Sequence, residues 1–295
     1  MALIPRHFMN SVVAIGDRKP DGTAQWVGSG FFYGKRVKVI DNASSLFRTY
    51  LVTNKHVLAA LGAPIVRANP SGNVPATEHA VDLTDEDGKP LWVGHPDPDI
   101  DVVVAGVALD PLREQGYEVD FIQDTQAARV SEMESFGMCE GDSVFLLGFP
   151  MGMIGESRSA AIVRGGTLAR FRTLRDGHSK TMLIDGYVYP GNSGGPIFTK
   201  PEVMAITGTS AVSSAYLVGV VASYVPYEDV AISPQTQRVR VVFEENSGLT
   251  QAFPIDAIDE AIGAFETIHP LSTKTDQTEP ADDEGPAAAQ PSLGS

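Results

Sequence analysis

Short apolar runs separated by turn-forming residues fill most of the first 250 positions of the chain. These runs are rich in Val, Ile, Phe and Tyr and are bounded by Gly, Pro, Asp or Asn, which is the pattern of β-strands. They are SVVAIG, GSGFFYG, KVI, TYLVTN, DVVVAGVAL, DSVFLLGF, TMLIDGYV, YLVGVVASYV and RVRVVFE. Many short strands with little helical periodicity predict an all-β sandwich or a pair of β-barrels.

Helical periodicity is confined to two segments. One is DTQAARVSEMESF, near 124–136. The other is PIDAIDEAIGAFETI, near 254–268, where Pro254 stands near the first turn and apolar residues recur at helical spacing: Ile255, Ile258, Ile262 and Phe265. From residue 269 the composition changes to Pro, Ala, Ser, Asp and Glu, which predicts a disordered acidic tail over 269–295.

Charge and composition narrow the classes of partner. Hydrophobic residues make up 43% and charged residues 20% of the 295 positions, as in a globular protein. The net charge is −15, of which −4 belongs to the tail, so the body carries −11. A surface of that sign repels nucleic acid, and we therefore expect none as a partner.

Cysteine usage and the N-terminus bear on location. Cys139 is the single cysteine, which precludes an intrachain disulfide and fits a reducing compartment. Pro5, Arg6 and His7 interrupt the apolar start of the chain, so no signal peptide is predicted. No apolar run approaches the roughly 20 residues that cross a bilayer. We expect a cytoplasmic protein without membrane association.

The segment GYVYPGNSGGPIF, 186–198, is the most specific motif. Its glycines permit backbone angles that other residues resist, and they let the N–H groups of Gly191 and Ser193 point into one pocket. Gly194 and Gly195 are expected to clear the approach of a substrate. Ser193 is therefore the candidate nucleophile, and the two N–H groups are candidate oxyanion donors. The alternative is a plain glycine-rich turn.

A serine nucleophile needs a base and a group that orients the base. His56 follows the apolar strand TYLVTN, a context that the five other histidines lack. Asp101 stands at the mouth of the strand DVVVAGVAL, whereas Asp97 and Asp99 are interpreted as parts of an Asx-rich turn. A metal site at His95, Asp97 and Asp99 has no further ligand spacing to support it, and we predict neither a metal nor a cofactor.

The order His56, Asp101, Ser193 resembles that of chymotrypsin-fold, trypsin-like serine proteases. GSGFF, VTNKHV, DPDIDVVV, GDSVFLLGFPMG and IDGYVYPGNSGGPIF are most similar to the motifs of the Deg-type, or high-temperature-requirement, branch. The resemblance covers about residues 9–250. It implies peptide-bond hydrolysis through an acyl-enzyme, with His56 as base, Asp101 as its orienting acid, and a protein or peptide as substrate.

The implied fold is two packed antiparallel β-barrels, followed by a C-terminal helix and the acidic tail. The boundaries predicted are a first barrel at 9–110, a linker at 111–140, a second barrel at 141–250, a helix at 251–268 and the tail at 269–295. By motif alignment the substrate pocket involves Tyr187, Val188, Ala222, Ser223 and Tyr224. No aspartate stands at the pocket base, which favours an apolar or small P1 residue. Packing within the barrel is the alternative for both tyrosines.

Two departures from the family pattern matter. Asn192 replaces the aspartate that pairs with a newly cut N-terminus in the secreted branch, which argues against activation by cleavage. The residues after 250 are too few for a peptide-binding PDZ domain. A cytosolic protease calls for selectivity or for an activating partner. The competing hypotheses are a protease-fold scaffold without turnover and a hydrolase of small esters or amides.

Overall fold

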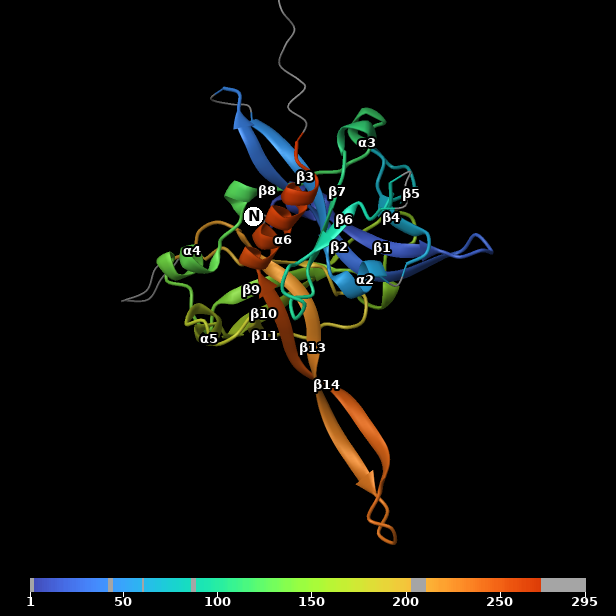
Figure 1. Cartoon of the computed structure of the whole chain (residues 1–295), viewed down its shortest axis with the longest axis vertical. Coiled ribbons are helices and arrows are strands. Elements are labelled where there is room, and N and C mark those ends of the chain that lie inside the picture. The colour runs from blue at the N-terminus through green and yellow to red at the C-terminus, as the bar shows by residue number, and fades with distance from the viewer. Residues whose placement is uncertain (1–2, 42–44, 60, 86–88, 203–210, 272–295) are drawn as a thin grey trace, which may run out of the picture.

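A computed structural model describes residues 3–41, 45–59, 61–85, 89–202 and 211–271. Its strands form two sheets that pack side by side, and one long hairpin projects away from the body (Figure 1). The predicted acidic tail lies outside the described residues, apart from its first three positions. No helix in the described ranges is long and apolar enough to cross a membrane.

The N-terminal half forms an eight-stranded sheet in the order β5-β4-β1-β2-β3-β7-β6, with β8 pairing to β2 in parallel. Central β2 aligns Phe31 with Val12 of β1 and with Val52 of β3. The strands are β1 (Val12–Arg18), β2 (Ala24–Val39), β3 (Ser45–Thr53), β4 (Pro64–Ala68), β5 (Thr77–Ala80), β6 (Trp92–Gly94), β7 (Val103–Gly106) and β8 (Ile122–Gln123).

The C-terminal half forms a closed antiparallel barrel in the order β10-β11-β14-β13-β12-β9. Its strands are β9 (Ser143–Gly148), β10 (Ile162–Arg170), β11 (Met182–Asp185), β12 (Pro196–Thr199), β13 (Leu217–Ile232) and β14 (Val239–Pro254). β12 contains the last three residues of the serine motif, 196–198, so the barrel wall anchors that loop. The all-β, two-unit architecture agrees with the chymotrypsin-like fold expected from the motifs.

Helices are short except the last. They are α1 (Arg6–Ser11), α2 (Lys55–Ala59), α3 (Asp110–Glu114), α4 (Val130–Ser135), α5 (Arg172–Arg175) and α6 (Ile255–Ile268), with 3-10 turns η1 (Asp124–Gln126) and η2 (Pro150–Gly152). The continuous helix suggested near 124–136 is divided into η1 and α4. α6 confirms the predicted apolar face, which is buried. Pro254 is its N-cap residue, near the first turn as predicted.

One hydrophobic core joins the two sheets. It contains Phe31 and Tyr50 from the first sheet, Leu147 and Phe198 from the barrel, and the buried face of α6. The ring of Phe8 in α1 stacks on Phe198 with centroids 4.7 Å apart. Because these side chains are nearly inaccessible to solvent, their burial fixes how the sheets sit against each other. That placement brings the histidine and serine motifs together.

Candidate active site

His56 lies in α2, directly after the end of β3. Thr53 and Asn54 at this junction are fully buried, and their side chains donate to the carbonyl oxygens of Ser29 (2.7 Å) and Asp101 (2.6 Å). Val57 in the next position packs into the core of the first sheet. α2 therefore presents its neighbour His56 outward, with 53% of the side chain exposed.

Asp101 makes two contacts with His56. Its Oδ1 accepts the backbone N–H of His56 at 3.1 Å, and its Oδ2 pairs with the ring Nδ1. A carboxylate against Nδ1 favours the tautomer that keeps its proton there. Nε2 is then free to accept a proton from another group, as a general base must.

The two other aspartates of the motif do not contact His56. Lys180, from the barrel, lies 2.7 Å from Asp97 and 2.8 Å from Asp99. The hydrogen bond from Lys180 is the main reason why the pKa of Asp97 is lowered. Asp97 also accepts the N–H of Asp99 at 3.0 Å, which is the Asx turn expected from the sequence. These carboxylates therefore link the two halves of the molecule.

His95 is occupied on both ring nitrogens. Its Nε2 lies 2.8 Å from a carboxylate oxygen of Glu260, and its Nδ1 accepts the N–H of Asp97 at 3.0 Å. The side chain is 2% exposed. Neither nitrogen is free for a metal in the cluster that the sequence analysis considered.

The serine loop between β11 and β12 depends on three glycines. Gly191 and Gly194 have φ of +99° and +83°, a region that L-residues avoid. A β-carbon on Gly194 would press on the carbonyl oxygen of Ser29 and on the hydroxyl of Thr53, and one on Gly195 would press on the carbonyl of Leu147. The expectation that Gly194 and Gly195 clear a path for substrate is therefore wrong. Their missing side chains allow the loop to pack against the body.

Two backbone N–H groups of this loop are available to a ligand. Asn192, Gly194 and Gly195 donate to the carbonyls of Tyr189, Val221 and Asn192. Among the described residues, the N–H groups of Gly191 and Ser193 donate to nothing. The carbonyl before Gly191 accepts the N–H of Met151 at 2.6 Å. In a trans peptide the N–H points opposite to that carbonyl, so the N–H of Gly191 is directed away from Met151.

Ser29 of β2 holds both of these loop residues from the other half of the molecule. Its hydroxyl donates to the carbonyl of Gly191 at 2.6 Å and accepts the N–H of Phe149 at 2.9 Å. Its own N–H donates to the carbonyl of Ser193 at 2.9 Å. The sequence predicts GSGFF as a strand that resembles a motif of the Deg-type branch, without a role for Ser29. The available signal was a polar residue between two glycines in an otherwise apolar run, and the structure shows that its hydroxyl is fully buried.

Ser193 is half-buried, and its hydroxyl donates to the carbonyl of Ala222 at 3.2 Å. The structure describes both Ser193 and His56, and no hydrogen bond joins them. Its neighbour Gly194 nonetheless packs on Thr53, three positions before the histidine. A rotation of the Ser193 side chain is therefore needed before His56 could take its proton. Such bonds are often loose in ligand-free sites.

Asn192 closes the turn below the serine. It is 1% exposed, and its Oδ1 accepts the N–H of Tyr189 at 3.0 Å. Its Nδ2 is buried and meets no acceptor among the described residues. The loop is thus held by a neutral side chain in the position where the secreted branch has an acid.

The residues expected to form the substrate pocket are divided between core and surface. Val188 and Ala222 are buried, and the carbonyl of Ala222 faces the nucleophile. The Ser223 hydroxyl donates to Gln251 at 3.4 Å, and the Tyr224 hydroxyl donates to Glu244 at 2.5 Å. Tyr187 is 49% exposed and would touch a β-carbon at Gly248. Ala222 is the member of this set with a direct contact to Ser193.

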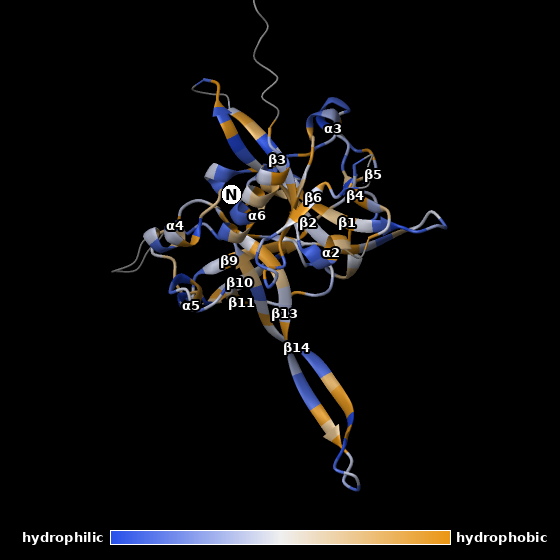
Figure 2. Ribbon diagram, viewed as in Figure 1, coloured by the Kyte–Doolittle hydropathy of each residue, from blue (hydrophilic) through white to orange (hydrophobic). Residues whose placement is uncertain are grey.

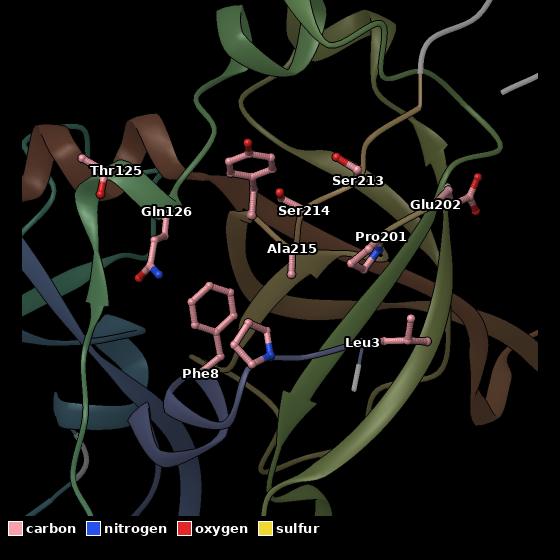
Figure 3. Close-up of a pocket in the computed structure, with 11 residues that line it drawn as sticks. Leu3, Phe8, Thr125, Gln126, Pro201, Glu202, Ser213, Ser214 and Ala215 are labelled. Carbon is pink, nitrogen blue, oxygen red and sulfur yellow. The ribbon is translucent and has the colours of Figure 1, made fainter. Parts of the chain in front are cut away.

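A separate cavity of about 560 Å³ lies between α1, η1 and the segment around Pro201 and Ser213 (Figure 3). Leu3, Phe8 and Ala215 form its apolar part, and Gln126 and Glu202 its polar part. His56, Asp101 and Ser193 do not line it. The cavity is therefore distinct from the candidate active site.

Comparison with known proteins identifies the family. The family model of the trypsin-like peptidase domain matches residues 28–206, more than half of the chain. The chain belongs to this family. All three members of the candidate triad fall within the matched range of the trypsin-like peptidase domain.

One solved structure similar to this trypsin-like peptidase domain is the MamO protease domain from Magnetospirillum magneticum in its apo form. It shares 14% sequence identity, with 86% of this chain and 96% of that one covered, at a TM-score of 0.45. No curated protein matches the sequence.

Proposed function

We propose that this trypsin-like peptidase domain is a serine endopeptidase with the triad His56, Asp101 and Ser193. The observation that carries the proposal is that two parts of the site are each formed, the His56–Asp101 pair and the loop of Ser193. Asp101 contacts both the backbone and the ring of His56, and the loop of Ser193 leaves two N–H groups without a partner in the described chain. A decayed site has no need to keep both features.

The mechanism follows from these positions. The Ser193 hydroxyl leaves the carbonyl of Ala222, turns to Nε2 of His56 and attacks the scissile carbonyl as the imidazole takes its proton. Asp101 stabilises the imidazolium and later lets His56 protonate the leaving amine. The N–H groups of Gly191 and Ser193 bind the oxyanion, where each donor contributes on the order of 3 kcal/mol to lowering the barrier.

The substrate would be a polypeptide bound beside β13. When Ser193 turns away, the carbonyl of Ala222 becomes free to accept an N–H from the substrate backbone. No acidic side chain is found among the five pocket residues, and we propose that P1 is apolar or small. Cleavage of a peptide library tests this preference, and strict cleavage after Lys or Arg would contradict it.

Conditional activity is part of the proposal. In the resting arrangement the nucleophile is bonded to Ala222 instead of its base, which fits a protease that is latent until a substrate or a regulatory partner arrives. Such restraint would suit a cytoplasmic enzyme among potential substrates. The same resting bond is the observation that favours the alternative, a scaffold without turnover.

Labelling with a fluorophosphonate tests the proposal without knowledge of the substrate. The wild-type chain should label, and Ser193→Ala and His56→Ala should not. Ser135→Ala, an exposed serine in α4, is the matched control and should label like the wild type. Peptide and small-ester substrates are then compared. Turnover of esters alone would favour the small-substrate hydrolase. A folded wild type that stays unlabelled would have a site that is either latent without its partner or dead, and the scaffold hypothesis would gain support.

A further inference from the structure

β13 and β14 continue past the barrel as an isolated two-stranded ribbon. Residues 226–232 pair with 239–246, and the ribbon projects away from the rest of the molecule (Figure 1). From 226 to 245 every residue except Ser233 is exposed. A lone hairpin with both faces in water is marginally stable, so its length requires an explanation.

Apolar residues recur along both strands of this ribbon, as the orange bands show in Figure 2. Opposed residues in an antiparallel pair share a face, and successive residues alternate between faces. Val230 therefore shares one face with its partner Val242, while Val241 and Phe243 lie on the other. Large apolar residues that are 45–58% exposed are Tyr227, Val230, Ile232, Val239, Val241, Val242 and Phe243. An exposed patch of this kind marks an interaction surface.

The charges of the ribbon are sorted along its length, with Glu228 and Asp229 of β13 beside the acidic end of the β14 segment. The segment RVRVVFEE, 238–245, begins with Arg238 and Arg240 near the tip and ends with Glu244 and Glu245 near the barrel. None of the four forms a salt bridge with another described residue. Glu244 accepts a hydrogen bond from Tyr224. Read in the opposite direction, the segment places its basic half against its acidic half, with Arg238 against Glu245 and Val241 against Val242.

The outer edge of β14 is also open. One edge pairs with β13 along the whole ribbon, and the other meets β11 only at Leu249–Ala252, by the pairs described. The backbone of 239–245 therefore presents N–H and C=O groups that have no strand beside them. Such an edge is a template for another strand.

We propose that a second copy of this chain binds here, with the two β14 edges pairing antiparallel about a two-fold axis. A two-fold axis perpendicular to the sheet leaves every side chain on its own face. Paired residues also share a face, so they must lie an even number of positions apart, and the axis must pass through a residue that pairs with its own copy. An axis at Val241 opposes Arg238 to Glu244, and an axis at Val242 opposes Arg240 to Glu244. Both registers place opposite charges together twice and join the apolar centres into one four-stranded sheet.

The sorting of charge is what selects a second copy over an unrelated apolar partner. An unrelated partner could bind either end of the ribbon with a surface of opposite charge. Only an antiparallel copy of the same strand calls for one basic end and one acidic end on that strand. An isologous interface requires this self-complementarity. The inference does not depend on turnover at Ser193.

Sedimentation equilibrium of the full chain tests the proposal. The wild type should dimerise. R238E/R240E makes both ends of the segment acidic and E244R/E245R makes both basic, so each should weaken the dimer about tenfold or more. The quadruple variant restores opposite charges in reverse and should recover wild-type association. R36E/K38E, the same charge change at the exposed end of the β2–β3 hairpin, is the control and should dimerise normally.

Three results would overturn this inference. They are a wild type that is monomeric at all concentrations, an oligomer that is unaffected by both block reversals, and a quadruple variant that stays as weak as either parent. Melting temperatures close to that of the wild type would show that the variants are folded, because the ribbon lies outside both cores. Labelling by the fluorophosphonate is scored separately, since it reports on Ser193 alone.

Discussion

Replacing Ser29 by alanine should disable the serine loop, which is the oxyanion loop of the proposed mechanism, from the opposite half of the molecule. The change removes the hydrogen bond to the carbonyl of Gly191 and the one accepted from Phe149. It keeps the backbone bond from residue 29 to the carbonyl of Ser193. The peptide group that follows Gly191 thus loses its hydrogen bond to β2, while Ser193 keeps its backbone hydrogen bond to residue 29.

The magnitude follows from burial. Ser29 and Phe149 are at most 1% exposed, so the N–H of Phe149 and the carbonyl of Gly191 lose their partner without gaining water. Each orphaned buried group costs about 1–3 kcal/mol, and for the two groups we expect a loss of about 2–6 kcal/mol in the free energy of unfolding. If the N–H of Gly191 drifts from the oxyanion, kcat should fall by roughly 100-fold, with KM changing little.

The assay compares melting temperature, fluorophosphonate labelling rate and steady-state kinetics for Ser29→Ala and Ser11→Ala. Ser11 is an equally buried serine whose hydroxyl donates to the carbonyl of Phe8 at 2.7 Å, far along the chain from the loop. Both variants should lose stability, but only Ser29→Ala should label slowly while still folded. Equal labelling rates for the two folded variants would refute the reasoning.

Three further predictions follow from the site and its supports. Asp101→Asn should keep the fold, because an amide oxygen can still accept the N–H of His56. It should lower kcat by about 10⁴-fold, because the amide favours the wrong tautomer of the His56 ring. Unchanged turnover would contradict the assignment of Asp101. Gly194→Ala should lower the free energy of unfolding by at least about 1–2 kcal/mol, since its φ is positive and its β-carbon meets Thr53, and chemical denaturation would measure this loss. Glu140→Gln should lower the melting temperature at neutral pH, because the N–H groups of Arg172 and Phe171 hold the pKa of Glu140 at about 2. A depressed carboxyl pKa stabilises the fold above the ordinary value of 4.5, so the difference from wild type should shrink as the pH falls from 4.5 toward 2, and a constant difference would contradict it.

Features with a local sequence signal were predictable. The apolar face of α6 is a repeat within one helix, and the structure buries it as expected. Asp101 was separated from Asp97 and Asp99 by its place at the mouth of a strand, and it is the one that contacts His56. In each case the residues on which the prediction rests lie within a few positions of one another in the sequence.

Features that depend on contacts between residues remote in sequence were not predictable. The roles of Gly194 and Gly195 were misread because their missing side chains face Ser29, Thr53 and Leu147, which are remote in sequence. The run YLVGVVASYV gave no sign that β13 continues beyond the barrel as a ribbon. Pairing with β14 determines that length, and the partner strand begins only after the tip.

The serine loop takes its shape from the docking of the two sheets. Its own turn supplies the bonds among Tyr189, Asn192 and Gly195, but β2 and β3 supply the bonds or packing at Gly191, Ser193 and Gly194. Free N–H groups at Gly191 and Ser193 are therefore a product of the interface as much as of the motif. Any perturbation that loosens this interface, including the loss of Lys180 between Asp97 and Asp99, should relax the oxyanion loop before it unfolds either sheet.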